Sequence, residues 1–253
     1  MNKTIFLQEP RSYLYKDNTK KSEIVSEILY GDKLKIIQRK GKWIKIRNLY
    51  DGYIGYINKT LSESYFKPSY KINVLKASIY IKKKSNYIKT KKFLSFASKI
   101  MILKKEKKFI NFHKKYWIKT KDLIKINHTK KNLSKIAKLF LNIKYKWGGV
   151  NFTGIDCSAL IQIIYKYNNK FCPRDSKDQI NFFTRKRNKR NFSKNDLIFW
   201  KGHVALCLNS KFLIHAYGPK KKVIIMEIKK TITEIEKKAK LKIISTNMMS
   251  RIT

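Results

Sequence analysis

The first half of the chain repeats itself at a distance of 66 residues. Segments 30–37 (YGDKLKII) and 43–46 (WIKI) recur as 96–103 (FASKIMIL) and 109–112 (FINF). In both copies short stretches of alternating apolar and polar residues are separated by polar turns, which is the pattern of short β-strands. The repeat therefore predicts two similar modules, and each has too few residues for anything but a small all-β barrel.

A buried helix is predicted to begin at Cys157. Three glycines lie within 148–154, Asp156 and Ser158 are residue types that cap helices, and an apolar run (ALIQIIY) follows at 159–165. At a helix start, unpaired backbone N–H groups and the positive end of the helix dipole stabilise a thiolate. Cys157 is therefore a candidate nucleophile, and the alternative is a small buried packing residue, the role of most free cysteines.

Two of the four histidines frame a predicted hairpin. Segments 203–208 and 211–217 have the composition of strands and are joined by a short polar turn. A three-residue loop would set His203 directly opposite His215 on one face of the sheet, whereas a two-residue loop would put them on opposite faces. One imidazole would then accept the proton of Cys157 while the other fixes its tautomer. The alternative is a pair of histidines that only fill or edge a core.

Other reaction chemistries fit the sequence less well. The cysteines Cys157, Cys172 and Cys207 and the histidines lack the close Cys-x-x-Cys or His-x-x-x-His spacing of zinc sites, so no metal and no cofactor is expected. No serine lies in a Gly-x-Ser-x-Gly elbow, and no phosphate-binding loop of the Gly-x-x-x-x-Gly-Lys type occurs. An odd number of cysteines argues against a disulfide framework and suits a reducing compartment.

Six motifs follow one another in the second half of the chain: Tyr-x-Trp-Gly-Gly at 145–149, Asp-Cys-Ser at 156–158, Pro-Arg-Asp-Ser at 173–176, Asn-Asp-Leu-Ile-Phe-Trp at 195–200, Gly-His-Val-Ala at 202–205 and Ile-His-Ala at 214–216. From about Leu133 onward the chain thereby resembles the NlpC/P60 cysteine peptidases, papain-like enzymes that cut peptidoglycan stem peptides. Where that family usually has Asp-Cys-Ser-Gly, this chain has Ala159, a small residue that suits a helix.

The resemblance implies a role for each motif residue. Cys157 would be the nucleophile, His203 the base and His215 the third, orienting member. The residues implied to surround the substrate, with the carboxylates meeting its free amino terminus, are Tyr145, Trp147, Asp156, Ser158, Asp175 and Ser176. Local sequence also offers structural alternatives: Asp156 as a helix cap, Trp147 as a core residue, and Asp175-Ser176 as a turn or cap before the next helix.

The repeated modules resemble bacterial SH3-like domains, which precede this type of peptidase. In some relatives the first such domain walls off one end of the substrate cleft, a role expected here for the module with Tyr30, Tyr53 and Tyr56, although strand aromatics more often pack within their sheet. The predicted fold class is therefore α+β. A papain-like NlpC/P60 catalytic domain at 128–253 follows two small all-β SH3-like barrels at 1–65 and 66–127.

The charge of the chain is strongly positive, with 60 Lys+Arg against 16 Asp+Glu and a net charge of +44. Such a chain would bind polyanions in a salt-sensitive way. The lysines are spread through all segments together with abundant Ile and Asn, as a bias toward A+T-rich codons would produce. We therefore expect no specific nucleic-acid partner.

The amino-terminal segment predicts where the protein acts. Residues 1–10 contain no apolar run long enough for a signal peptide, and no stretch approaches the length of a membrane span. These features indicate a cytoplasmic enzyme that acts on imported wall fragments, which favours recycling over lysis.

By resemblance, the expected reaction is cleavage of the γ-D-glutamyl–diamino acid bond in stem peptides with a free N-terminal L-Ala. The expected partners are peptidoglycan-derived peptides, and the oligomeric state is left open. Two alternatives remain: an NlpC/P60-type amidase or acyltransferase on another substrate, which would still depend on Cys157, and a non-catalytic basic polymer-binding protein, which would not.

Overall fold

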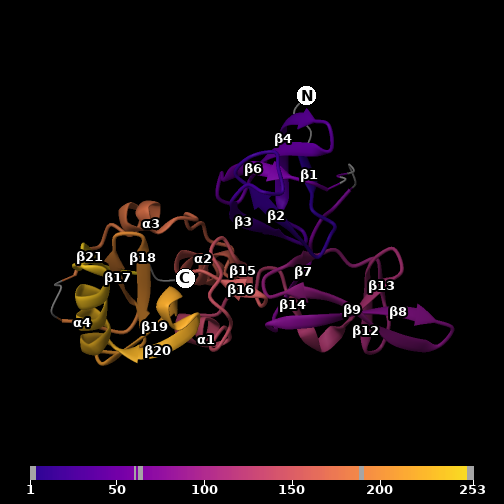
Figure 1. Ribbon diagram of the computed structural model, residues 1–253. Helices are drawn as coiled ribbons and strands as arrows, with labels where there is room; N and C mark the ends of the chain where they lie inside the picture. Colours follow the sequence, from indigo (N-terminus) through magenta and orange to yellow (C-terminus); the bar gives the residue numbers. More distant parts are fainter. Residues whose placement is uncertain (1–3, 60, 62–64, 188–190, 250–253) are drawn as a thin grey trace. The chain divides into compact units, whose positions relative to one another are not determined.

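The computed structural model describes residues 4–59, 61, 65–187 and 191–249 (Figure 1). The chain divides into two compact units, Met1–His128 and Thr129–Thr253. No helix in the described ranges is long and apolar enough to cross a membrane.

The first module of unit 1 is a six-stranded antiparallel sheet. Its strands lie in the order β1 (Thr4–Phe6), β4 (Lys33–Lys40), β5 (Trp43–Asn48), β6 (Ile54–Ile57), β2 (Arg11–Tyr15) and β3 (Ile24–Leu29). Alternate apolar side chains point to one face, as the sequence pattern requires. They form a core of Ile5, Leu7, Leu14, Ile28, Leu34, Ile44, Ile46 and Ile57.

The second module distributes its strands over two sheets. A three-stranded sheet has the order β10 (Lys99–Ile100), β7 (Tyr70–Ile72) and β14 (Leu123–Lys125), and the short helix η1 (Thr120–Asp122) precedes β14. A five-stranded sheet has the order β11 (Lys104–Lys105), β12 (Phe109–His113), β13 (Tyr116–Lys119), β8 (Lys76–Lys83) and β9 (Asn86–Ser95). Both sheets contribute buried side chains to one core.

The repeated segment adopts the same local structure in both modules. Gly31 and Ala97 occupy equivalent positions and both have left-handed backbones, with φ of 79° and 64°. The N–H of Gly31 donates to Leu7 O (2.8 Å), and the N–H of Ala97 donates to Ile72 O (3.0 Å). Sequence repetition therefore corresponds to repetition of a specific turn.

The predicted barrels are not closed in the described residues. In the first module the outer strands β1 and β3 do not pair with each other, and in the second the strands separate into two sheets. A bulge shifts the register between Ile36 and Gln38 in β4, and another does so in β8, which bends each sheet over its core. In the described residues the modules are therefore bent open sheets, and not the closed barrels that the sequence predicts.

Tyr30 joins the two modules within unit 1. It is 2% exposed, belongs to the core of the second module, and lies edge-on to Phe112 with ring centroids 5.4 Å apart. Its carbonyl accepts a hydrogen bond from Lys99 N (3.1 Å). Tyr30 is therefore a packing residue, in agreement with the structural alternative for the aromatics of this module.

Unit 2 has the predicted α+β composition. Its antiparallel sheet has the order β20 (Lys222–Glu227), β19 (Phe212–Tyr217), β18 (His203–Cys207), β17 (Asp196–Trp200) and β21 (Ser245–Met248). The helices are α1 (Leu133–Lys138), α2 (Cys157–Tyr167), α3 (Ser176–Phe182) and α4 (Ile228–Ala239), and the smaller elements are β15 (Val150–Asn151), β16 (Gly154–Ile155) and η2 (Gly218–Lys220).

Helix α2 packs against β18 and β19, and α4 packs against β20 (Figure 1). Strands β17 and β18 are buried along nearly their whole length, which explains why their sequences are continuously apolar rather than alternating. The first residue of α2 and the first residue of β18 are the positions that bear the candidate nucleophile and base. The packing of these two elements therefore sets the geometry of the site.

Candidate active site

Helix α2 begins at Cys157, as the sequence predicts. Asp156 is the N-cap residue with an extended backbone, and its carboxylate accepts a hydrogen bond from Ala159 N (2.8 Å). All eleven residues of the helix are buried. The capping role of Asp156 therefore fixes the point at which the chain turns into the helix and presents Cys157.

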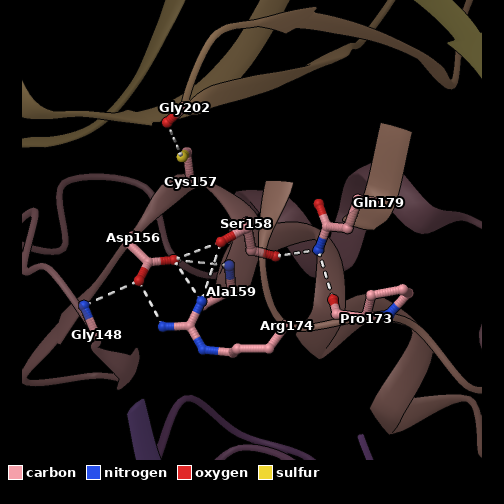
Figure 2. A network of polar contacts seen from close by, with 9 residues as sticks. All are labelled: Gly148, Asp156, Cys157, Ser158, Ala159, Pro173, Arg174, Gln179 and Gly202. Carbon is pink, nitrogen blue, oxygen red and sulfur yellow. Dashed lines mark hydrogen bonds and ion pairs between the residues drawn. The ribbon is translucent and has the colours of Figure 1, made fainter. Parts of the chain in front are cut away.

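The thiol of Cys157 faces the start of β18. Its sulfur lies 3.9 Å from Gly202 O, and the side chain is only 4% exposed. Figure 2 shows the sulfur pointing toward Gly202 and away from the polar cluster around Asp156. A backbone N–H, that of Val204, also interacts with the sulfur. Cys157 thus lies against the two residues that flank His203 in the chain.

His203 and His215 form a hydrogen-bonded pair. Nε2 of His203 lies 2.9 Å from Nδ1 of His215, and the two rings are tilted with centroids 5.1 Å apart. Because Nε2 of His203 is engaged by His215, Nδ1 is the nitrogen left for a thiol. The structure therefore brings the two predicted histidines together and places Cys157 beside the strand start that carries one of them.

The predicted register of the β18–β19 hairpin is wrong by two residues. The strands pair Leu206 with Ile214 and Cys207 with Leu213. Continued along both strands, this register places His203 diagonal to His215 instead of directly opposite it. The cause is the turn: Asn209 Oδ1 accepts hydrogen bonds from the backbone N–H groups of Lys211 (2.8 Å) and Phe212 (2.7 Å). A register shift of two residues keeps both histidines on one face of the sheet, so their side chains still contact each other.

Burial makes both partners of the proposed proton transfer neutral at neutral pH. It raises the pKa of the Cys157 thiol to about 12, with the negative charge of Asp156 adding to the effect. It lowers the pKa of His203 to about 4 and the pKa of His215 well below its ordinary value. At the helix start, burial therefore acts against the thiolate, whereas backbone N–H groups such as that of Ser158 act in its favour.

Asp156 is the centre of a buried polar network (Figure 2). Arg174 donates from its two terminal nitrogens to the two carboxylate oxygens (3.0 and 2.5 Å) and also to Ser158 Oγ (3.0 Å). Gly148 N and Ser158 Oγ donate to the same carboxylate at 3.0 and 3.1 Å. The lone pairs of Asp156 are thus occupied by the protein, so this carboxylate positions the helix start instead of offering a free anion.

Arg174 belongs to this network, although its place in the Pro-Arg-Asp-Ser motif did not by itself predict a site residue. The amino-acid composition does distinguish this residue. Arginine is rare in this chain, with eight residues among the 60 Lys+Arg, and every other cation in residues 129–184 is lysine. A bidentate contact to a carboxylate needs a guanidinium, because the single ammonium of lysine does not match two oxygens.

Helix α3 places Asp175 and Ser176 next to this network. Asp175 is the N-cap residue of α3, is half-buried, and does not cap the helix with its side chain. Gln179, one turn into α3, donates to Ser158 O (2.9 Å) and to Pro173 O (2.9 Å), which ties α3 to the start of α2 (Figure 2). The motif at 173–176 is therefore held beside the residue that follows Cys157.

The loop before β15 carries the two predicted aromatics. Tyr145 is half-buried, with its ring 3.6 Å from the position that a Cβ on Gly218 would take. Burial raises the pKa of Tyr145, and negative charge on Cys157 or Asp156 raises it further, so its hydroxyl stays protonated. Trp147 is 59% exposed, which excludes the core alternative. The loop turns tightly at Gly149, where a Cβ would lie 2.5 Å from Gly154 O.

Two segments of the chain match known protein families. Residues 142–240 match the NlpC/P60 family, and residues 14–60 match the bacterial dipeptidyl-peptidase Sh3 domain. The γ-D-glutamyl-L-lysine dipeptidyl-peptidase of Bacillus subtilis (strain 168) is 24% identical over 241 residues, which cover 84% of this chain and 79% of that protein. Dipeptidyl-peptidase 6 of Lysinibacillus sphaericus is 33% identical over 87 residues, a match that spans only 34% of this chain and 32% of that enzyme.

Solved structures share the fold. An NlpC/P60 family protein from Bacillus cereus ATCC 10987 is similar with a TM-score of 0.80 at 20% identity, covering 97% of this chain and 99% of that one. An NlpC/P60 endopeptidase from Photobacterium damselae subsp. piscicida is similar with a TM-score of 0.62 at 14% identity, covering 97% and 72%. With its buried cysteine, its histidine pair and these matches, the chain carries an NlpC/P60 domain preceded by an SH3 domain of the bacterial dipeptidyl-peptidase type.

Proposed function

We propose that this protein is a cysteine peptidase that hydrolyses the γ-D-glutamyl–diamino acid bond of peptidoglycan stem peptides with a free N-terminal L-Ala. The observation that carries the proposal is Cys157 at the start of a buried helix, beside the strand that holds the His203–His215 pair, in an NlpC/P60 domain. The name of the Bacillus subtilis relative, a γ-D-glutamyl-L-lysine dipeptidyl-peptidase, supports the choice of bond.

The proposed reaction runs through a thioester. As Cys157 Sγ attacks the γ-carbonyl carbon of D-Glu, Nδ1 of His203 accepts the thiol proton, and the carbonyl π electrons move to the oxygen, which backbone N–H groups at the start of α2 stabilise. When the C–N bond breaks, His203 returns the proton to the leaving amine of the diamino acid. Water then attacks the thioester with His203 again as base, releasing L-Ala-γ-D-Glu and the free thiol.

The neutral resting state of the site fits this sequence of proton transfers. A thiol with a pKa of about 12 is a poor nucleophile, so the proton has to leave as the carbon–sulfur bond forms. A neutral imidazole is the form that accepts it, and burial keeps His203 in that form. His203 therefore acts as a general base during the attack instead of pairing with a preformed thiolate.

We further propose that the carboxylate of Asp175, half-buried at the start of α3, meets the ammonium group of a free amino terminus. Tyr145 and Trp147 supply a protonated hydroxyl and an exposed indole on the neighbouring loop. Binding of the amino terminus at this position would direct cleavage to the bond that follows the second residue of the peptide.

Mass spectrometry of peptide products tests the proposal. Tripeptides L-Ala-γ-D-Glu-X, with X as L-Lys or diaminopimelate, and their N-acetylated forms are incubated with the wild-type protein and with Cys157→Ala under reducing conditions. We expect L-Ala-γ-D-Glu only from peptides with a free amine and only with the wild-type protein. Absence of cleavage of every peptide, with Cys157 shown to be reduced, would refute the proposed substrate and favour an amidase or acyltransferase reaction, or polymer binding alone.

We also propose that the reaction belongs to recycling of wall fragments in the cytoplasm. A stem peptide gains a free L-Ala amine only after its amide bond to the sugar has been cut, so such a cleavage would have to supply the substrate. The three cysteines, all free and buried, support a reducing compartment. Comparing turnover of free tripeptide with release from intact wall, together with detection of the protein in cell fractions, tests this placement.

A further inference from the structure

His215 makes a second contact that its pairing with His203 does not explain. Its Nδ1 faces His203, and its other nitrogen, Nε2, lies 3.4 Å from the sulfur of Met226 on β20. The residue is 0% exposed, and Tyr217 stacks on its ring with centroids 4.6 Å apart and planes at 12°. Water is therefore kept from Nε2, and among the described residues the sulfur of Met226 is its hydrogen-bonding partner.

The chemistry of sulfur limits how protons are arranged along this chain of contacts. A thioether accepts a hydrogen bond weakly and has no proton to donate. If His215 carried its proton on Nδ1, its Nε2 lone pair would face the lone pairs of the sulfur. If the proton is on Nε2, that N–H points at the sulfur and Nδ1 accepts the N–H of His203. Only the second arrangement gives each contact one donor and one acceptor.

We infer that Met226 is a positioning residue, whose sulfur holds His215 in the Nε2–H tautomer and thereby leaves Nδ1 of His203 unprotonated. In that tautomer His203 carries its own proton on Nε2, toward His215, and presents a lone pair on the side left for Cys157. The opposite arrangement would put a proton on Nδ1 of His203, which could not then act as a base. The catalytic part of this inference rests on the proposed function, whereas the tautomer assignment stands without it.

Met226 lies diagonal to His215 in the sheet, because β19 and β20 pair His215 with Ile224 and Leu213 with Met226. The diagonal position brings its flexible side chain over the ring edge of His215 while it also packs against the core of unit 2. Leucine has a similar volume and no acceptor. The Met226→Leu substitution therefore separates the sulfur contact from the packing.

The first experiment is nitrogen NMR of the full-length wild-type protein with ¹⁵N-labelled histidine. Single His→Gln substitutions at His113 and His128 identify the signals of these two imidazoles, and the signal that disappears in His203→Gln distinguishes His203 from His215. We expect His215 to show a protonated Nε2 and an unprotonated Nδ1, and His203 to show the same pattern. A proton on Nδ1 of His215 would overturn the inference, whatever the outcome of the peptide assays.

The second experiment compares Met226→Leu with Met249→Leu, the same substitution at a buried methionine of the same unit that is 3% exposed. Loss of the sulfur acceptor should give mixed tautomers at His215 and lower kcat/KM about fivefold, while Met249→Leu leaves both unchanged. An unchanged tautomer in Met226→Leu, or equal activity of the two variants, would show that Met226 only packs. If Met226→Leu does not fold, the wild-type spectrum still decides, and if no peptide is cleaved, the spectra still test the tautomer.

Discussion

Arg174 supports the start of helix α2 through its two hydrogen bonds to the carboxylate of Asp156. It and Asp156 are almost fully buried, with side chains 2% and 6% exposed, and no water replaces a lost partner at such a site. The pair need not be more stable than two apolar residues, but removal of one member leaves a buried charge uncompensated.

We predict that Arg174→Met lowers the free energy of unfolding of unit 2 by about 3 kcal/mol, measured by urea denaturation. The double variant Asp156→Asn/Arg174→Met should recover part of that loss, because it removes the unpaired carboxylate as well. Equal losses in the single and double variants would contradict the role assigned to the pair.

The protonation of Cys157 makes a separate prediction. With a thiol pKa of about 12, alkylation of Cys157 by iodoacetamide should accelerate continuously as the pH rises through 9, because the thiolate fraction keeps growing. The rate is followed by mass spectrometry of the peptide that contains Cys157, with Cys157→Ala as the control. A rate that is already constant from about pH 5 upward would indicate a preformed thiolate–imidazolium pair.

The histidine pair couples stability to pH. The pKa of His203 is lowered from 6.5 to about 4 and that of His215 is also lowered well below 6.5, so the unfolded chain binds more protons than the native one as the pH falls below about 6.5. Stability is therefore fully present above about pH 6.5 and is lost as the pH falls, with a slope of up to about 1.4 kcal/mol per pH unit for each histidine. Urea titrations at pH 7 and 5 should show this loss for the wild type and a smaller one for His203→Gln/His215→Gln.

At the scale of elements, the β18–β19 hairpin depends on its turn. Asn209 accepts two backbone hydrogen bonds, so Asn209→Ala should cost about 1 kcal/mol of stability, whereas the neighbouring exposed Ser210→Ala should cost almost nothing. Denaturation curves of the two variants provide the comparison. If both substitutions have the same effect, the turn does not set the register.

This hairpin also shows how far local sequence predicts structure. The alternative with a three-residue loop correctly predicts that His203 and His215 share a face, because a register shift of two residues leaves each side chain on the same face of the sheet. The register itself depends on which pair of residues closes the turn, and that is decided by the side chain of Asn209. The start of α2 was predictable for a similar reason, since Asp156 caps the helix locally.

Features that depend on residues distant in sequence were not predictable in the same way. Arg174 meets Asp156 across 18 positions, so no local pattern specifies their contact. The burial that raises the pKa of Cys157 comes from packing against residues distant in sequence, such as Gly202, which no local pattern specifies. Closure of the SH3-like sheets likewise depends on pairing between strands that are far apart in the chain.

For the whole molecule, the net charge of +44 predicts association without specificity. Binding to duplex DNA should be independent of base sequence, equal for the wild type and Cys157→Ala, and lost between about 50 and about 200 mM salt. Fluorescence anisotropy with two unrelated duplexes measures this. A preference for one sequence that persists at the higher salt concentration would instead indicate a dedicated nucleic-acid site.

The central claim is that Cys157 and the His203–His215 pair act together on a γ-D-glutamyl bond. The most direct measurement is kcat/KM for release of L-Ala-γ-D-Glu from a free-amine tripeptide by the wild type, Cys157→Ala and His203→Ala. We predict turnover by the wild type and a loss of at least about 100-fold in each variant, because nucleophile and base act as one unit. Equal release by the wild type and Cys157→Ala would contradict the account.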